Sequence, residues 1–186
     1  MQSNRNKSRT QSKSIALCGM MTALTIVLMV AGGLIPVATY CVPMAAGILL
    51  LPILLEYGKK TAWTTYAAAS LIALLLGVDK EAAFFYVFFG HYPLLKWELD
   101  RIRSIPLRFT AKILMYNLSF AAMYALLGLV MNMDALLQEF TQMGFYVLAA
   151  FVLLFNLCML LYDRLIMPLA IIYIKKLRPR FHFLLK

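Results

Sequence analysis

Few side chains in this sequence have the chemistry for catalysis or ligand binding, and His91 is the first of them. His91 stands in FFGHYPLLK, between Gly90 and Pro93, at the end of an apolar run. An ionisable side chain inside a membrane segment is a candidate functional group. The alternative is a structural histidine that donates to a backbone carbonyl freed by a kink. No second histidine or paired carboxylate lies one helical turn away, so the spacing does not indicate a metal site.

Asp163 and Arg164 are the second candidates, because they follow Asn156 in the last apolar run. Adjacent residues on a helix point in different directions, so these two charges should find partners elsewhere. One interpretation is a charge network that fixes helix ends near the membrane boundary, where long side chains reach water. The other is a contact surface for a cytoplasmic or membrane partner. The expected binding partners of the two charges are Glu56, Lys59, Lys96, Arg101 and Lys112.

Motifs of known catalytic sites are missing from the sequence. It holds no GxSxG elbow, no HExxH, no paired aspartate and no phosphate-binding glycine loop. Cys18, Cys41 and Cys158 are far apart and form no CxxC pair, so neither a zinc site nor a disulfide framework is indicated. No carboxylate is expected deep in the membrane, which argues against a proton-driven carrier. We therefore expect no enzyme activity, no metal and no cofactor.

Composition indicates a membrane protein. Apolar residues make up 63% of the 186 residues and charged residues 14%, and the mean hydropathy is +0.80. Such a chain is too apolar for a soluble domain of this size. The net charge of +10 lies in short runs beside apolar stretches, so we expect contact with anionic lipid headgroups and not with nucleic acid.

The apolar runs must position these candidate residues, and six of them can be recognised. Only helices satisfy the backbone polar groups of such runs in lipid, so the sequence predicts an all-α, polytopic helix bundle with six transmembrane helices. The first run is longer than the apolar region of a signal peptide, so we interpret it as a membrane span. The expected spans are residues 15–36, 41–57, 61–77, 82–95, 109–131 and 143–161, the last of which can continue to residue 174.

Charged residues of the loops test the number of spans. All Lys and Arg except Lys112 and Arg164 fall outside the apolar runs, with the basic clusters on alternate sides. Cytoplasmic loops carry the excess of basic residues, so both termini are predicted to be cytoplasmic. This predicts a basic tail over residues 1–14, a membrane domain over 15–174 and a second basic tail over 175–186.

Two local features suggest how the helices are shaped and packed. Ala16, Gly19 and Ala23 form a small-residue face on the first predicted helix, which another helix could approach closely. That helix could belong to this chain or to a second protein. In the fourth run Pro93 cannot donate to the carbonyl of Phe89, so a kink is expected there.

Several of these features together resemble the substrate-binding S components of energy-coupling factor (ECF) transporters. They are the basic start, the run ALCGMMTAL, six spans in under 200 residues and the basic tail. EYG at 56–58, FFGHYPLLK at 88–96 and NLCMLLYDRL at 156–165 are similar to an S-component-like group of Firmicute membrane proteins. The alanine-rich pattern of the first helix is partly replaced by Cys18, Met20 and Met21.

The resemblance implies a multi-pass protein of the bacterial plasma membrane that captures a vitamin-like ligand or another micronutrient from outside. Its partners would be a coupling subunit, docked on Ala16, Gly19 and Ala23, and two ATPases that supply the energy. The ligand would lie in the outer half, among aromatic walls that suit a small planar molecule. The residues nominated for ligand binding are Tyr40, Tyr124, Asn132 and Tyr146. As an alternative, each can be a membrane-interface residue.

A different function class fits the same residues. A non-transporting membrane scaffold of the rod-shape-determining D type is also small, polytopic and poor in catalytic residues. A transporter component needs an enclosed outer cavity, whereas a scaffold can pack that region with Met and Phe. A self-sufficient secondary carrier would show inverted repeats, and the two halves are not similar. Structural or coupling roles are assigned to Glu56, His91, Tyr92, Pro93, Asn156, Asp163 and Arg164.

Overall fold

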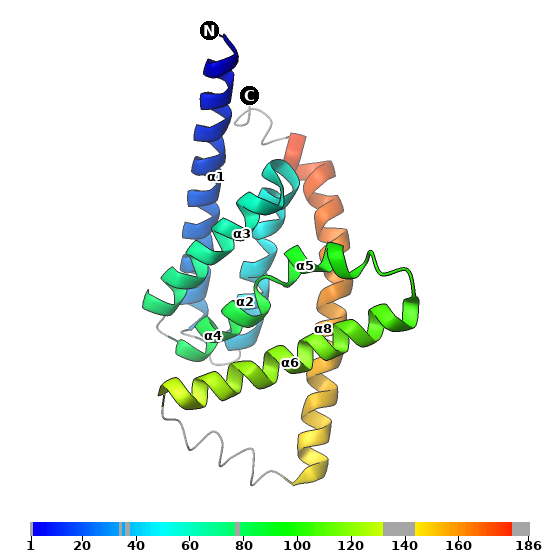
Figure 1. The fold of residues 1–186 in the computed structure, drawn as a ribbon. Helices are drawn as coiled ribbons and strands as arrows, with labels where there is room; N and C mark the ends of the chain where they lie inside the picture. The colour runs from blue at the N-terminus through cyan, green and yellow to red at the C-terminus, as the bar shows by residue number, and fades with distance from the viewer. Residues whose placement is uncertain (1, 34, 36–37, 77–78, 132–143, 180–186) are drawn as a thin grey trace. The chain divides into compact units, whose positions relative to one another are not determined.

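Every regular element among the residues described by the computed structural model is a helix. The structure describes residues 2–33, 35, 38–76, 79–131 and 144–179. The helices, labelled in Figure 1, are α1 (Gln2–Gly32), α2 (Ala38–Ile48), α3 (Leu50–Leu76), α4 (Lys80–Phe89), α5 (Tyr92–Leu99), α6 (Ile105–Met131) and α8 (Phe145–Ile172), followed by the π-helical turn η1 (Tyr173–Leu177).

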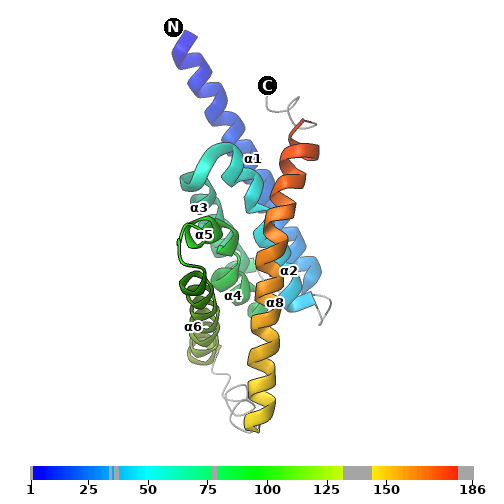
Figure 2. The same cartoon turned by 90° about the vertical axis from the view of Figure 1, so that its right-hand side faces the viewer.

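Three helices are long and apolar enough to cross a membrane, and a bent pair could supply a fourth span. The three are Gln11–Gly32, Ile105–Leu129 and Tyr146–Leu177, and the pair is Thr39–Ile48 with Leu50–Leu76, bent by 52°. These helices confirm the all-helical class and indicate a membrane protein. The last apolar run continues as one helix, as Figure 2 shows for α8, and passes into η1. Six spans with cytoplasmic termini remain a prediction.

The second and third predicted spans have different boundaries in the structure. The chain breaks at Leu49, inside the expected second span, and then runs as α3 to Leu76. Pro52 explains the break, because it lacks the N–H that would continue α2, and it is tolerated in the first turn of α3. The expected loop after Tyr57 is a kink at Gly58, which has φ 82° and ψ 179°. Only glycine adopts this backbone region readily.

The fourth predicted span consists of two short helices. Asp79 caps α4, because its carboxylate accepts a hydrogen bond from the N–H of Ala82 at 3.1 Å. The helix ends at Phe89, and α5 starts at Tyr92, so the kink predicted at Gly90 and Pro93 is a complete break. With 10 and 8 residues, neither helix alone reaches the ~20 residues that cross the hydrocarbon core.

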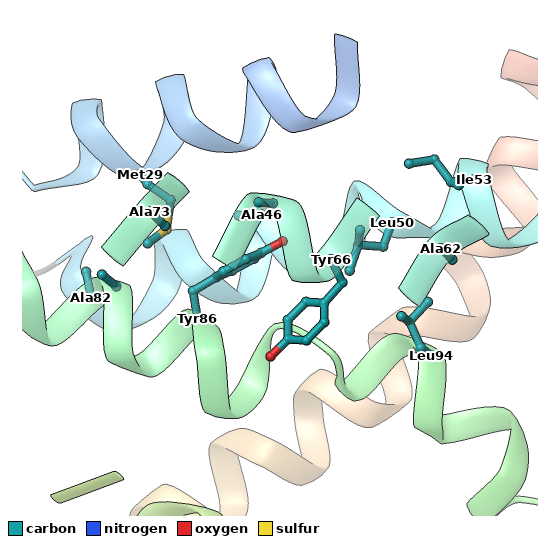
Figure 3. Packing of buried hydrophobic residues seen from close by; sticks show 12 residues of the cluster. Met29, Ala46, Leu50, Ile53, Ala62, Tyr66, Ala73, Ala82, Tyr86 and Leu94 are labelled. Atoms are coloured by element: carbon teal, nitrogen blue, oxygen red, sulfur yellow. The ribbon is translucent and has the colours of Figure 1, made fainter. Parts of the chain in front are cut away.

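Contacts divide the chain into two units. The first unit contains residues 1–94 and 166–186, and the second contains residues 95–165. In the first unit α1 packs against α2 and α3, and α2 packs against α4. Figure 3 shows its core, where Tyr86 of α4 and Tyr66 of α3 are the largest labelled side chains. Small residues let these helices approach closely; they are Ala46, Ala62, Ala69, Ala73, Ala82 and Ala83.

The second unit contains the end of α5, all of α6 and the first part of α8. Phe120 of α6 is the centre of an aromatic cluster that joins the two long helices. Its ring centroid lies 4.7 Å from that of Phe155 and 5.9 Å from that of Phe151, both on α8. These apolar contacts hold α6 and α8 together next to the polar groups described below.

Candidate functional site

The small-residue face of α1 is open in the structure. Ala16, Gly19 and Ala23 are all exposed. A Cβ atom added at Gly19 would meet no atom within 4 Å in the part of the chain that the structure describes. Among the described residues of the first unit, no neighbouring helix therefore covers this face. The face is available for a lipid or a second protein.

Tyr40, the first nominated ligand residue, lies in the first unit and is attached to α4. Its hydroxyl donates to the carboxylate of Glu81 at 2.6 Å, and its ring meets Phe85 edge to face at 5.3 Å. The neighbouring Thr39 donates to Asp79 at 3.0 Å. The start of α2 is thereby fixed to the first turn of α4, and 39% of Tyr40 stays exposed.

The other nominated ligand residues lie elsewhere in the chain. Tyr124 lies on α6 in the second unit, with its ring 4.6 Å from that of Phe120. Tyr146 lies near the start of α8, also in the second unit, and is 87% exposed. Asn132 falls outside the described residues. The shared pocket for these side chains stays a prediction.

His91 lies in an aromatic group of the first unit. Its ring centroid is 5.5 Å from that of Tyr66 and 5.8 Å from that of Trp63, both on α3. The hydroxyl of Tyr66 donates to the carbonyl of Val87 and lies 3.5 Å from Nδ1 of His91. Tyr92 and Pro93 follow as buried residues at the start of α5. The two aromatic partners were not predictable from sequence, because they are 25 or more positions away in the chain.

Glu56 joins α3 to the C-terminal turn of the same unit. Its carboxylate pairs with Nε of Arg178 at 2.9 Å, and the hydroxyl of Tyr173 lies 3.5 Å from it. Glu56 lies two residues before the Gly58 kink, so the kink and the ion pair occupy the same corner. This gives the EYG motif a structural explanation: the glycine turns the chain and the carboxylate holds the turn against η1.

A buried network of four charges lies in the second unit. The carboxylate of Asp163 on α8 lies 2.6 Å from Nζ of Lys96 and 2.9 Å from Nζ of Lys112. The same two ammonium groups reach Asp100, at 3.1 Å from Lys96 and 2.7 Å from Lys112. The side chains of Lys96, Lys112 and Asp163 are only 7%, 7% and 8% exposed. Two positive and two negative charges thus balance in a largely buried place.

Asp100 is the outermost member of this network, with 34% of its side chain exposed. Burial alone would raise the pKa of its carboxyl. Hydrogen bonds from Lys112 and Lys96, together with their charges, outweigh burial and lower the pKa below its ordinary value. Asp100 therefore stays ionised and completes the balance of charge around the two lysines.

Part of this network was predicted from the sequence. Lys96 and Lys112 were among the expected partners of Asp163, whereas Asp100 was not considered. Its spacing of four residues from Lys96 on a helical segment was the signal that could have found it. Arg164 is exposed, as expected for a residue that is adjacent to Asp163 on the helix. The network connects the end of α5 and the first part of α6 with the interior of α8, where Asp163 lies nine residues before the helix ends.

Asn156 forms a reciprocal amide pair with Asn117 of α6. The amide of Asn117 donates to Asn156 at 3.0 Å, and that of Asn156 donates back at 3.2 Å. Each amide also donates at 2.8 Å to a carbonyl one turn earlier in its own helix. The pair therefore uses its donors within the two helices and connects α6 with α8.

We expect the two asparagines to be energetically coupled. Asn117→Ala and Asn156→Ala should each destabilise the second unit, and the double variant should lose less than the sum. Interhelical hydrogen bonds of this kind contribute about 0.6–1.7 kcal/mol. Unfolding in mixed detergent micelles, followed through a double-mutant cycle, measures this coupling. Effects that add within about 0.3 kcal/mol would show that the pair does not act together.

Comparison of the chain with protein-family models, curated proteins and solved structures gave no match.

Proposed function

We propose that the chain is the membrane-embedded S component of an ECF-type importer for a vitamin or another micronutrient. The observation that carries the proposal is the exposed small-residue face of Ala16, Gly19 and Ala23 on α1. A subunit that docks through a membrane helix needs such a face, because helices in lipid associate by close packing at small residues. In this proposal the chain binds the ligand, and a coupling subunit with two ATPases supplies the energy.

The proposal includes six spans in the bacterial plasma membrane, with both termini in the cytoplasm. Basic side chains at the C-terminal turn support this orientation, since Lys175, Lys176 and Arg178 are exposed directly after the last apolar helix. The ligand site would use Tyr40, Tyr124, Asn132 and Tyr146. These residue types favour a small planar ligand held between aromatic rings.

Gly19→Leu should weaken partner association while the protein still inserts into the membrane. The leucine side chain would occupy the space that a partner helix needs, so we expect roughly a tenfold loss of recovered coupling subunit, equivalent to ~1.4 kcal/mol. A tagged pull-down from native membranes in mild detergent, with mass spectrometry of proteins and retained small molecules, measures this loss.

Gly144→Leu is the matched control, because a Cβ atom at Gly144 also meets nothing within 4 Å in the described structure. It lies beside α8 and not on α1, so recovery should stay at the wild-type level. Undiminished recovery with Gly19→Leu would contradict the docking assignment.

A scaffold of the rod-shape-determining D type is the second candidate. It is favoured by the packing of α4, where Phe84, Phe85, Tyr86 and Phe89 are all buried. The same pull-down separates the two functions. Co-purification of ATPases and a small molecule supports the importer, whereas cell-wall or division proteins without either support the scaffold.

A further inference from the structure

The first unit contains an elongated apolar hollow along α1. Its volume is about 420 Å³, within the usual range of small-molecule sites. Apolar side chains form nearly all of its wall, and Lys13 and Tyr173 are the polar exceptions. The lining residues are Lys13, Ala16, Leu17, Met20, Met21 and Leu24 of α1, Leu49 and Pro52 around the start of α3, and Tyr173 and Leu177 of η1.

The length of the hollow matches one leaflet of a bilayer. From Lys13 to Leu24 α1 advances by eleven residues, which is roughly 16 Å at 1.5 Å per residue. Half of the hydrocarbon core is about 15 Å. Lys13 stands near the beginning of one candidate span, Gln11–Gly32, and Leu177 ends another, Tyr146–Leu177. The hollow therefore extends from a membrane boundary towards the middle of the bilayer.

Positive charge is concentrated at the boundary end of the hollow. Lys13 lines it there, and the exposed Lys175 and Lys176 lie between the lining residues Tyr173 and Leu177. The acidic side chain of this corner, Glu56, is paired with Arg178 at 2.9 Å. Charge at this end is thus complementary to an anion, while the remainder of the hollow accepts hydrocarbon.

A protein helix fits these features less well. A transmembrane partner seated along the whole hollow would remove the ammonium of Lys13 from water, and desolvation of a charge costs free energy. The small-residue face also points elsewhere: at 100° per residue its centre lies roughly 90° around α1 from the centre of the hollow, and only Ala16 belongs to both.

We infer that the hollow binds an anionic phospholipid, with one acyl chain between α1 and η1 and the phosphate at Lys13, Lys175 and Lys176. Each lysine near an anionic headgroup contributes through charge, and the chain contributes through burial of its methylene groups. This site shares only Ala16 with the proposed docking face and none of the residues nominated for the ligand pocket. It does not depend on the proposed importer function.

Native mass spectrometry of the full chain tests the inference. The purified protein is mixed in detergent with equal amounts of palmitoyl-oleoyl phosphatidylglycerol and palmitoyl-oleoyl phosphatidylcholine, which carry the same chains. We expect one phosphatidylglycerol to be retained in preference. Lys13→Gln should weaken its binding about fivefold, the equivalent of one lysine near an anionic surface, and should leave phosphatidylcholine unchanged.

Lys80→Gln is the control for charge, because Lys80 is exposed at the start of α4, beside Asp79 near Gly33 at the opposite end of α1. Met20→Trp should fill the hollow and remove binding of phosphatidylglycerol, whereas Leu75→Trp on an exposed position of α3 should not. Equal affinity for the two lipids, or equal losses in Lys13→Gln and Lys80→Gln, would overturn the inference.

A measurement on the unaltered protein removes any dependence on how the variants fold. Phosphatidylglycerol with a photoactivatable diazirine in its acyl chain is added to vesicles of phosphatidylcholine that contain the protein. Labelling should concentrate on the segment from Leu17 to Leu24 and on η1. Labelling spread evenly over the exposed apolar faces of α6 and α8 would show general lipid contact and contradict a site.

Discussion

Asp163→Ala lowers the free energy of unfolding by about 3–5 kcal/mol, the largest loss that we expect from one substitution. The variant leaves the ammonium groups of Lys96 and Lys112 buried with one carboxylate, Asp100, between them. Removing one partner of a buried ion pair leaves a charge uncompensated, which costs this amount. Unfolding in mixed detergent micelles, or loss of the monodisperse fraction after heating, measures the loss. Ligand binding by the folded fraction should change less.

Arg164→Ala is the matched control, since Arg164 is the neighbouring residue and is exposed. Its effect should stay within about 0.5 kcal/mol. The paired variant Lys112→Met with Asp163→Leu removes one charge of each sign and keeps Lys96 beside Asp100. It should be less destabilised than Asp163→Ala, because no net charge is left in the buried site. A double variant that is worse than the single one would contradict this explanation of the network.

Gly58→Ala should destabilise the first unit by about 1–3 kcal/mol. Gly58 has φ 82° and ψ 179°, a region that residues with a Cβ atom occupy only under strain of this size. Relief of the strain would straighten α3 and move Glu56 away from Arg178, which pairs with it at 2.9 Å. Thermal unfolding in detergent measures the loss of stability. Cross-linking of cysteines placed at positions 56 and 178 reports whether α3 has moved away from the C-terminal turn.

Gly19→Ala separates backbone strain from the loss of a glycine as such. Gly19 lies in regular helix with open surroundings, so alanine there should leave stability unchanged or raise it by up to about 1 kcal/mol. If Gly58→Ala behaves in the same way as Gly19→Ala, the kink at Gly58 is not a requirement of the fold.

The long helices were predictable from sequence because their apolar runs are long, although Lys112 lies within α6 and Asp163, Arg164 and Pro168 lie within α8. The expected fifth span, residues 109–131, is contained in α6, and the extension of the last run to residue 174 agrees with α8 and η1. The break at Leu49 was not predicted, because Pro52 lies inside an apolar run whose hydropathy does not change there. A kink near Pro93 was predicted, since Gly90 and the proline both weaken the same turn, and the structure has a complete break there.

Contacts within the candidate sites were less predictable, since they depend on the separation of helices in space. Charge and membrane level were enough to nominate Lys96 and Lys112 for Asp163, which are 67 and 51 positions away. The aromatic neighbours of His91 and the partner of Asn156 had no such signal, because Trp63, Tyr66 and Asn117 are ordinary residues of apolar helices. The shared pocket of the four nominated ligand residues stays a prediction.

The discontinuous first unit has a consequence for how the chain is made. Residues 1–94 are synthesised first, but the unit also contains residues 166–186. Glu56 can pair with Arg178 only after that residue, 122 positions later, has been synthesised. At 5–20 residues per second, the 84 residues from 95 to 178 take about 4–17 s to synthesise. During that time α1 to α4 are already synthesised, but the C-terminal turn is not. The ion pair at Glu56 therefore forms only after the helices of the second unit have been synthesised.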